Sequence, residues 1–440
     1  MKRLFFCLSV LGMMLTGCSK NDDGKSDKPN NNGNEQPENP NEPKLPELPA
    51  LPDPDDVCSA MDDLNFMAYC YENFDVNKDG KVSVTEANAA KEIYTTSSKW
   101  VSVKGIERFP NIEILSLNGS SITELDLRYN LKLKSISGYS SLLTTVLLPN
   151  TLTSIEKSAF KECASLIEIH FPASLTSIGV NAFYGCSSLT EINFPASLTS
   201  IGGSAFRGCS SLVEIHLSDN LTSIGEYAFS GCSSLTEINF PASLTSIRGF
   251  AFSGCSSLVE IHLPDNLTSI GERAFWSCSS LTEIHLPASL TWIGGSAFSG
   301  CSNLTKINLP DNLTSIGKTA FSGCSSLTEI HFPASLTSIG EYAFSGCSSL
   351  TEINLPASLA SIGESAFSGC SSLTEINFPA SLTSIGESAF SFCSNLTEIH
   401  LPASLTSIGE GTFWSCSSLT EINLPASLAS IGESAFSGCS

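Results

Sequence analysis

Basic residues are scarce in this chain of 440 residues, which has 22 lysines and arginines against 44 aspartates and glutamates, for a formal net charge of −22. Nucleic-acid binding requires a cluster of positive charge, so the deficit argues against it. Phosphate-binding loops, paired hydrolase carboxylates and nucleophile elbows are absent as well, and we therefore expect no enzyme. The apolar run from Leu4 to Leu15 is too short to span a bilayer.

Cysteine is abundant, but it lacks the spacing of a metal site. None of the 17 cysteines belongs to a Cys-x-x-Cys pair, and none has a neighbouring histidine. Thirteen of them, from Cys163 to Cys439, recur every 23 residues, which indicates a repeat. We expect these thirteen to form a ladder of buried thiols, because parallel side chains from equivalent positions rarely reach disulfide geometry. A disulfide ladder is the alternative.

The N-terminus reads as an export signal. A positive Met1-Lys2-Arg3 precedes the apolar run, which ends in Leu15-Thr16-Gly17-Cys18. This ending resembles the lipobox of bacterial lipoproteins, and the resemblance implies that residues 1–17 are a signal peptide and that Cys18 is acylated. The acidic Ser19–Asp23 is similar to the tag of lipoproteins exposed on gut and oral anaerobes. An outer-membrane protein facing the cell exterior is therefore predicted, with an ordinary secretory signal as the alternative.

Residues 18–57 form the predicted tether. Eight prolines and ten acidic residues against four lysines leave few large apolar side chains to bury. Such a segment cannot offset its chain entropy by burial, so we expect it to be disordered.

A calcium-loop signature begins at Asp75. Oxygen-bearing side chains stand at positions 1, 3 and 5, glycine at position 6 permits the sharp turn, and a glutamate at position 12 offers two oxygens. The predicted ligands are Asp75, Asn77, Asp79, Lys81 through its carbonyl, Ser83 through water, and Glu86. An apolar stripe at helical spacing precedes the loop and a second one follows it, formed by Leu64, Met67, Ala68, Tyr71 and Phe74 and by Ala87, Ala90 and Ile93. Residues 58–100 are therefore predicted to be an EF-hand-like helix-loop-helix with one structural calcium ion. The alternative is an acidic turn that serves only as a cap.

Cys58 and Cys70 lie twelve residues apart in the same exported region. A disulfide between them and two thiols held too far apart along one helix remain equally open.

Residues 148–440 repeat one 23-residue pattern, in twelve full copies and a thirteenth that stops at Ser440. A period of this length is typical of a solenoid. Alternation in Leu-Thr-Glu-Ile-Asn-Phe-Pro predicts a strand whose leucine, isoleucine and phenylalanine (Leu189, Ile192 and Phe194) point inward, ended by proline. Parallel strands would stack every 23 residues, after an irregular leucine-rich entry section at 101–147. The chain stops without a polar cap, which predicts a fragment or a recently lost end.

The repeat resembles the BspA-like class of leucine-rich repeats, whose members carry L-x-x-I-x-[L/F]-P, S-I-G and A-F-x-x-C in this order. The fold class implied is a leucine-rich repeat solenoid, mostly β. The resemblance further implies a surface or secreted protein associated with attachment to host matrix or to other cells, without a catalytic role for the repeat.

One strand face of the solenoid carries the candidate binding residues. Glutamate stands two residues before a histidine or asparagine in eleven of the twelve full copies, Lys306 being the exception. Such a column of like charge favours an acidic groove that docks a basic partner, or else a face that only provides solubility. The candidate groove residues are Glu191, Asn193, Glu214, His216, Glu237, Asn239, Glu260, His262, Glu283 and His285.

These features predict a lipid-anchored surface protein that binds a host or bacterial surface or matrix protein. An accessory glycan-binding lipoprotein of a nutrient-uptake system and a passive repeat spacer are the alternatives. Glycan binding calls for clustered aromatic side chains, whereas the aromatics here recur as core residues or are dispersed. Trp276, Trp292 and Trp414 are candidate exposed contacts.

Overall fold

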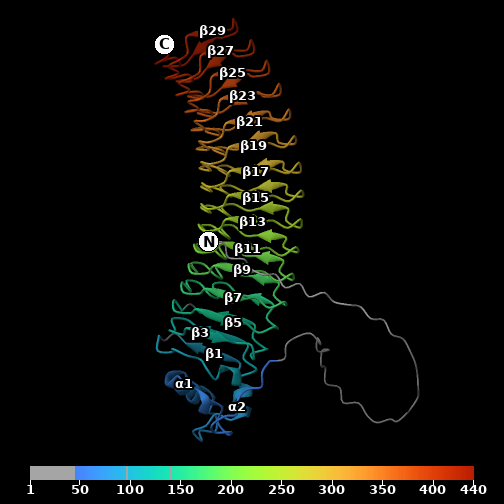
Figure 1. Cartoon of the computed structure of the whole chain (residues 1–440), viewed down its shortest axis with the longest axis vertical. Coiled ribbons are helices and arrows are strands. Elements are labelled where there is room, and N and C mark those ends of the chain that lie inside the picture. The colour runs from blue at the N-terminus through green and yellow to red at the C-terminus, as the bar shows by residue number, and fades with distance from the viewer. Residues whose placement is uncertain (1–44, 96–97, 139) are drawn as a thin grey trace, which may run out of the picture. The chain divides into compact units, whose positions relative to one another are not determined.

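The computed structural model describes residues 45–95, 98–138 and 140–440. Its contacts divide the chain into two units, Met1–Pro46 and Glu47–Ser440. The predicted signal peptide, Cys18 and most of the predicted tether lie outside the described residues. The second unit is a solenoid of stacked parallel strands preceded by a small helical region (Figure 1), which confirms the predicted fold class.

The helical region comprises η1 (Val57–Ala60), α1 (Leu64–Phe74) and α2 (Val84–Ala89). A further single turn, η2 (Ile106–Arg108), follows the first strand, β1 (Glu92–Thr95). The Asp63 side chain begins α1 by accepting hydrogen bonds from two backbone N–H groups of the first turn. The buried side chains of α1 are Phe66 and Cys70, while Leu64, the first residue of the predicted apolar stripe, is 71% exposed. No helix among the described residues is both long and apolar enough to cross a membrane.

Most turns of the solenoid contribute one short strand to each of two columns. The first column consists of β1 (Glu92–Thr95), β2 (Ile114–Leu117), β4 (Ser135–Ser137), β6 (Ser154–Ile155), β8 (Ser177–Ile178), β10 (Ser200–Ile201), β12 (Ser223–Ile224), β14 (Ser246–Ile247), β16 (Ser269–Ile270), β18 (Trp292–Ile293), β20 (Ser315–Ile316), β22 (Ser338–Ile339), β24 (Ser361–Ile362), β26 (Ser384–Ile385), β28 (Ser407–Ile408) and β30 (Ser430–Ile431). The stack begins with β1, before residue 101, where the sequence placed the entry section.

The second column carries the Glu-Ile-Asn or Glu-Ile-His segments. It consists of β3 (Glu124–Asp126), β5 (Thr145–Leu147), β7 (Glu168–His170), β9 (Glu191–Asn193), β11 (Glu214–His216), β13 (Glu237–Asn239), β15 (Glu260–His262), β17 (Glu283–His285), β19 (Lys306–Asn308), β21 (Glu329–His331), β23 (Glu352–Asn354), β25 (Glu375–Asn377), β27 (Glu398–His400) and β29 (Glu421–Asn423). Neighbouring strands pair in parallel with a shift of one repeat, so equivalent side chains stand side by side.

Ladders of identical side chains fill the space between the two columns. The repeated phenylalanines stack face to face, as in Phe183 and Phe206, whose ring centroids lie 5.1 Å apart at 4°. The repeated cysteines are free thiols, and Cys209 donates to the carbonyl of Phe183 at 3.3 Å. Burial raises the pKa of the Cys209 thiol to about 12. The ladder of buried thiols is therefore present as expected.

Close approach of successive turns explains the glycine that follows the repeated isoleucine. A Cβ atom at Gly271 would lie 2.5 Å from the backbone nitrogen of Gly249 in the preceding turn. A side chain at Gly271 would crowd the preceding turn, so the glycine favours close pairing of the strands at this point.

Candidate functional site

The strand face of the second column aligns the predicted groove residues. In β13, β15 and β17, for example, the middle isoleucine is buried, and the flanking glutamate and histidine or asparagine are exposed. Glu237, Glu260 and Glu283 stand beside one another across three paired strands. All ten predicted groove residues are exposed on this surface, which we call the acidic face.

In most strands of the acidic face, the glutamate contacts the residue two positions on. His262 Nε2 lies 3.2 Å from a carboxylate oxygen of Glu260, and the Asn193 amide donates to Glu191 at 2.7 Å. The side chains of these pairs are about half exposed or more, so solvent screens them and they add little stability. Lys306 interrupts the run of carboxylates between Glu283 and Glu329.

The acidic face is shallow. A depression of about 220 Å³ lies between β21 and β23, lined by Glu329, His331, Glu352 and Asn354 among others. Pockets for small molecules are typically larger and mostly apolar. A surface of this shape and charge suits contact with a broad basic surface better than enclosure of a small ligand.

The predicted calcium loop has its side chains turned toward its own backbone. Asp75 accepts from the amides of Asp79 and Gly80, and Gly80 adopts the left-handed φ of +83° that the signature requires. Glu86 reaches back across the loop and accepts from the amide of Val76 at 2.9 Å. The backbone and hydroxyl of Ser83 also donate to Glu86, and these bonds lower the pKa of its carboxyl below the usual range.

These residues fit a calcium ion in donor type, in order and in the turn at Gly80. In the described part of the chain, however, no three His, Cys, Asp or Glu side chains gather closely enough to hold a metal ion. Glu86 and Ser83 instead form a capping box at the start of α2, and the Lys81 side chain forms an ion pair with Asp53 at 2.9 Å. Coordination would therefore require Glu86 to exchange its backbone amide contacts for the ion.

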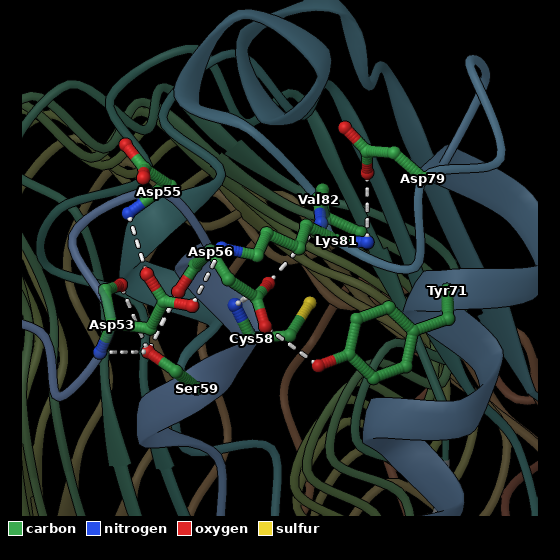
Figure 2. Close-up of polar contacts among 9 residues, drawn as sticks. All are labelled: Asp53, Asp55, Asp56, Cys58, Ser59, Tyr71, Asp79, Lys81 and Val82. Carbon is green, nitrogen blue, oxygen red and sulfur yellow. Dashed lines mark hydrogen bonds and ion pairs between the residues drawn. The ribbon is translucent and has the colours of Figure 1, made fainter.

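Asp56 joins the calcium loop to the helical region (Figure 2). Its carboxylate is buried and accepts hydrogen bonds from the amides of Cys58 and Val82, at 3.0 and 3.1 Å, and from the Tyr71 hydroxyl at 2.7 Å. The hydrogen bond to Asp56 and burial raise the pKa of Tyr71, burial contributing most. This cluster was not found in the sequence, because its members come from three separate segments.

Cys58 and Cys70 meet beneath this cluster. Both side chains are fully buried, both thiols are free, and they contact each other. Burial, followed by the neighbouring Cys58 thiol, raises the pKa of Cys70 well above its ordinary value. The view that the two cysteines lie too far apart along one helix is wrong, since Cys58 belongs to η1 and Cys70 to α1.

A second surface was missed in the sequence. A cavity of about 950 Å³ opens among the turns that join the two columns, and we call it the turn-face cavity. Its lining comes from six successive turns and comprises Arg207, Tyr227, Ser230, Gly231, Phe250, Ser253, Gly254, Glu272, Arg273, Trp276, Gly295, Ser296, Ser299, Lys318 and Thr319.

Two cationic side chains flank two aromatic rings along this cavity. The Arg207 guanidinium lies 4.9 Å from the ring centroid of Tyr227, and Arg273 lies 5.3 Å from that of Phe250. The Tyr227 and Phe250 rings stack at 4.4 Å and 17°. Two guanidinium groups thus bracket two stacked rings, an arrangement that orders all four side chains.

Tyr227, Phe250 and Arg273 occupy a left-handed backbone position, with φ of 58°, 57° and 52°. Serine or asparagine fills the equivalent position in other turns, for example Ser204 and Asn181. Bulky residues are uncommon in this conformation, so the backbone does not select them. The only indication of this surface in the sequence was the variation at this repeat position, and a consensus of the repeats does not show that variation.

The interpretation of the exposed aromatic residues as dispersed is wrong for this region. Trp276 is 44% exposed and lines the same cavity as Tyr227 and Phe250. Trp292 and Trp414 lie outside that cavity, and Trp414 packs against Phe392 with ring centroids 4.6 Å apart.

The fold and its surfaces define the class of protein, a leucine-rich repeat solenoid of the kind that typically binds other proteins and carries no enzyme activity. Residues 133–255, 222–348 and 314–440 match the BspA type leucine rich repeat region. The chain therefore belongs to the BspA-type leucine-rich repeat family. No functionally curated protein matches it.

One solved structure supports this assignment. A leucine-rich repeat protein from Bacteroides ovatus is 32% identical, with a TM-score of 0.60, over 75% of this chain and 80% of that one. A leucine rich cell surface protein from Faecalibacterium prausnitzii is 31% identical, with a TM-score of 0.44, over 64% of this chain and 83% of that one.

Proposed function

We propose that this protein is a lipid-anchored cell-surface scaffold whose acidic face docks a basic patch on a host or bacterial surface or matrix protein. The observation that carries the proposal is the alignment of exposed glutamates in consecutive strands, as in Glu352, Glu375 and Glu398. A fixed row of like charge raises the local potential and accelerates encounter with an oppositely charged surface. Because nearby carboxylates repel one another, a basic partner would also relieve that repulsion.

The proposed anchor is the acylated Cys18, followed by a tether. Two or more acyl chains hold a protein stably on a membrane, whereas one does not. We expect Cys18→Ser to release the protein from the outer membrane into the medium or the periplasm, as measured by fractionation. Retention of the variant in the membrane fraction would contradict the proposal.

The proposed calcium site has a structural role next to the first turns of the solenoid. Calorimetry on the full chain is expected to show binding in the range of about 0.1–1 mM that is typical of extracellular sites. Asp75→Ala should abolish the heat of binding and the calcium-dependent rise in melting temperature. Asp55→Ala, which removes an exposed carboxylate outside the loop, is the matched control.

Charge reversal tests the acidic face. The triple variant Glu237→Lys, Glu260→Lys and Glu283→Lys should bind purified matrix proteins or cultured epithelial cells at least tenfold more weakly than the parent chain. A control triple variant reverses three exposed glutamates on the turns, Glu387, Glu410 and Glu433, and so makes the same change in net charge.

The two variants separate a face-specific interaction from a general effect of charge. Equal loss in both would show that net charge alone governs binding. Absence of binding by the parent chain to all of these surfaces, with calcium present, would overturn the proposed function.

A further inference from the structure

We propose that the turn-face cavity binds an anionic oligosaccharide through Arg207, Arg273 and Lys318, with Trp276 as the sugar-stacking side chain. This site goes beyond the proposed protein binding, and it lies on the turns and not on the acidic face.

Cationic side chains are concentrated in the turn-face cavity. The regular repeats, residues 148–440, contain seven lysines and arginines, and none of them follows Lys318. Three of the seven line the turn-face cavity, together with a single acid, Glu272. In a chain with twice as many acidic as basic residues, this local excess of positive charge favours an anionic ligand.

The two guanidinium groups of the cavity are held in fixed positions. Stacking on Tyr227 and Phe250 fixes Arg207 and Arg273 three turns apart, which corresponds to about 14 Å at the usual strand spacing. Arg207 has no ion pair within the described residues, and the Arg273 guanidinium lies 3.9 Å from the nearest carboxylate oxygen of Glu272. Each guanidinium carries five N–H donors, so the pair can bind two separated anionic groups.

The remaining lining favours a sugar over an acidic peptide. Trp276 is partly exposed and lines the cavity, so its indole is available for stacking. Hydroxyl groups of Ser230, Ser253 and Ser299 line the same cavity and can both donate and accept hydrogen bonds. An exposed aromatic ring beside several hydroxyls matches the apolar face and the hydroxyl edge of a pyranose.

The extent of the cavity favours an oligomer over a single sugar. Its lining spans six turns, or about 24 Å at the usual strand spacing. Charges spaced along a carboxylated or sulfated chain could then meet Arg207, Arg273 and Lys318 in turn. Lys318 is held at the far end by an ion pair with Glu341 at 2.5 Å.

The repeat itself supplies variants that should fold. Other turns carry serine at the positions of Arg207, Arg273 and Trp276, as Ser230, Ser296 and Ser299 show. Arg207→Ser with Arg273→Ser, and separately Trp276→Ser, therefore replace each residue by one that the fold already accepts. Arg248→Gly is the matched control, because it removes an exposed arginine outside the cavity and restores the glycine of other turns.

The experiment measures binding of the chain from Ser19 to Ser440 to four probes by calorimetry. They are a heparin-derived hexasaccharide, a polygalacturonate hexasaccharide, neutral maltohexaose and a polyglutamate peptide. We expect binding to one or both anionic sugars, at least tenfold weaker in the double arginine variant, about fivefold weaker in Trp276→Ser and unchanged in Arg248→Gly. Comparison of the two anionic sugars shows whether sulfate or carboxylate is recognised.

Several results would overturn the proposal. They are equal affinity for maltohexaose, binding of polyglutamate alone, absence of binding to all four probes, and equal loss in Arg248→Gly. The triple glutamate variant of the acidic face should keep its affinity for the anionic sugar. Failure at the turn-face cavity is thereby distinguished from failure of the proposed protein binding.

Discussion

A single buried polar residue, Asp56, joins the separate parts of the helical region. Asp56 satisfies two backbone amides and one hydroxyl, and these donors come from η1, α1 and the calcium loop. Loss of one carboxylate would leave three buried or half-buried donors without an acceptor. The cost of an unsatisfied buried donor exceeds the net value of a hydrogen bond.

We therefore expect Asp56→Ala to lower the free energy of unfolding by about 1–3 kcal/mol. Tyr71→Phe, which removes only one of the three donors, should cost about 0.5–1.5 kcal/mol. Urea unfolding followed by circular dichroism measures both. Equal costs for the two variants would show that the amides of Cys58 and Val82 do not depend on this carboxylate.

Wherever the pattern repeats, the sequence predicts which strand residues point inward and which point outward. Alternation placed Ile192 inside and Glu191 and Asn193 outside, and the structure confirms this. The buried side of α1 was less predictable, because a single helix next to a solenoid can turn either of two apolar stripes inward. Contacts with Trp100, 34 residues later in the chain, select Phe66.

At the scale of the strands, like charges accumulate along the paired strands of the acidic face. Lys306 separates Glu283 from Glu329, and each of these carboxylates stands opposite it in the parallel register. Cross-strand pairs of opposite charge stabilise a sheet, while like charges directly opposite destabilise it.

Lys306→Glu should lower the free energy of unfolding by about 0.2–1 kcal/mol, more at low salt than at high salt. Chemical unfolding at two salt concentrations provides the measurement. Arg248→Glu makes the same charge change on an exposed turn and should have a smaller effect. A salt-independent loss in Lys306→Glu would attribute the effect to packing and not to charge.

The buried thiols make the stability of the repeats fall at alkaline pH. Burial raises the pKa of Cys209, Cys255, Cys301 and Cys347 to about 12, above the value of about 8.5 in an unfolded chain. Because the folded pKa is the higher one, the stability is complete below about pH 8.5. It falls as the pH rises toward 12, since the unfolded chain then releases protons that the folded chain retains.

We expect the urea midpoint to fall steadily above about pH 9, and a thiol reagent near pH 8 to modify Cys439 well before the other repeat cysteines. Cys439 is the half-exposed member of the ladder. Labelling is read by mass spectrometry. Rapid labelling of Cys278 or Cys301 in the folded protein would show that the ladder is open to solvent.

At the scale of the whole molecule, each turn contacts chiefly its neighbours. Stability is then close to a sum of terms for single turns and for their interfaces. Deletion of one 23-residue unit, residues 337–359, joins positions that are equivalent in the repeat. The variant should fold with the same circular dichroism per residue and with a modestly lower unfolding midpoint. Loss of the cooperative transition would contradict local stacking.

The solenoid could be predicted from the sequence because one pattern recurs every 23 residues, so the structure of a single turn predicts that of the other turns. The turn-face cavity could not be found in this way. Tyr227 and Phe250 are 23 residues apart, and only the path of the turns brings their rings to 4.4 Å. The shared pattern contains only the positions that are alike in all repeats, whereas the positions that vary between repeats line the cavity.

The register of the acidic face has a consequence for how a partner would occupy it. A surface that fits against Glu352, Glu375 and Glu398 meets nearly the same geometry after a shift of one turn. The face then behaves as a lattice of overlapping equivalent positions, on which a bound partner can step without leaving and the apparent affinity grows with the number of turns. The turn-face cavity lacks this translational symmetry, because no two of its turns carry the same side chains, so a ligand there has one place to bind.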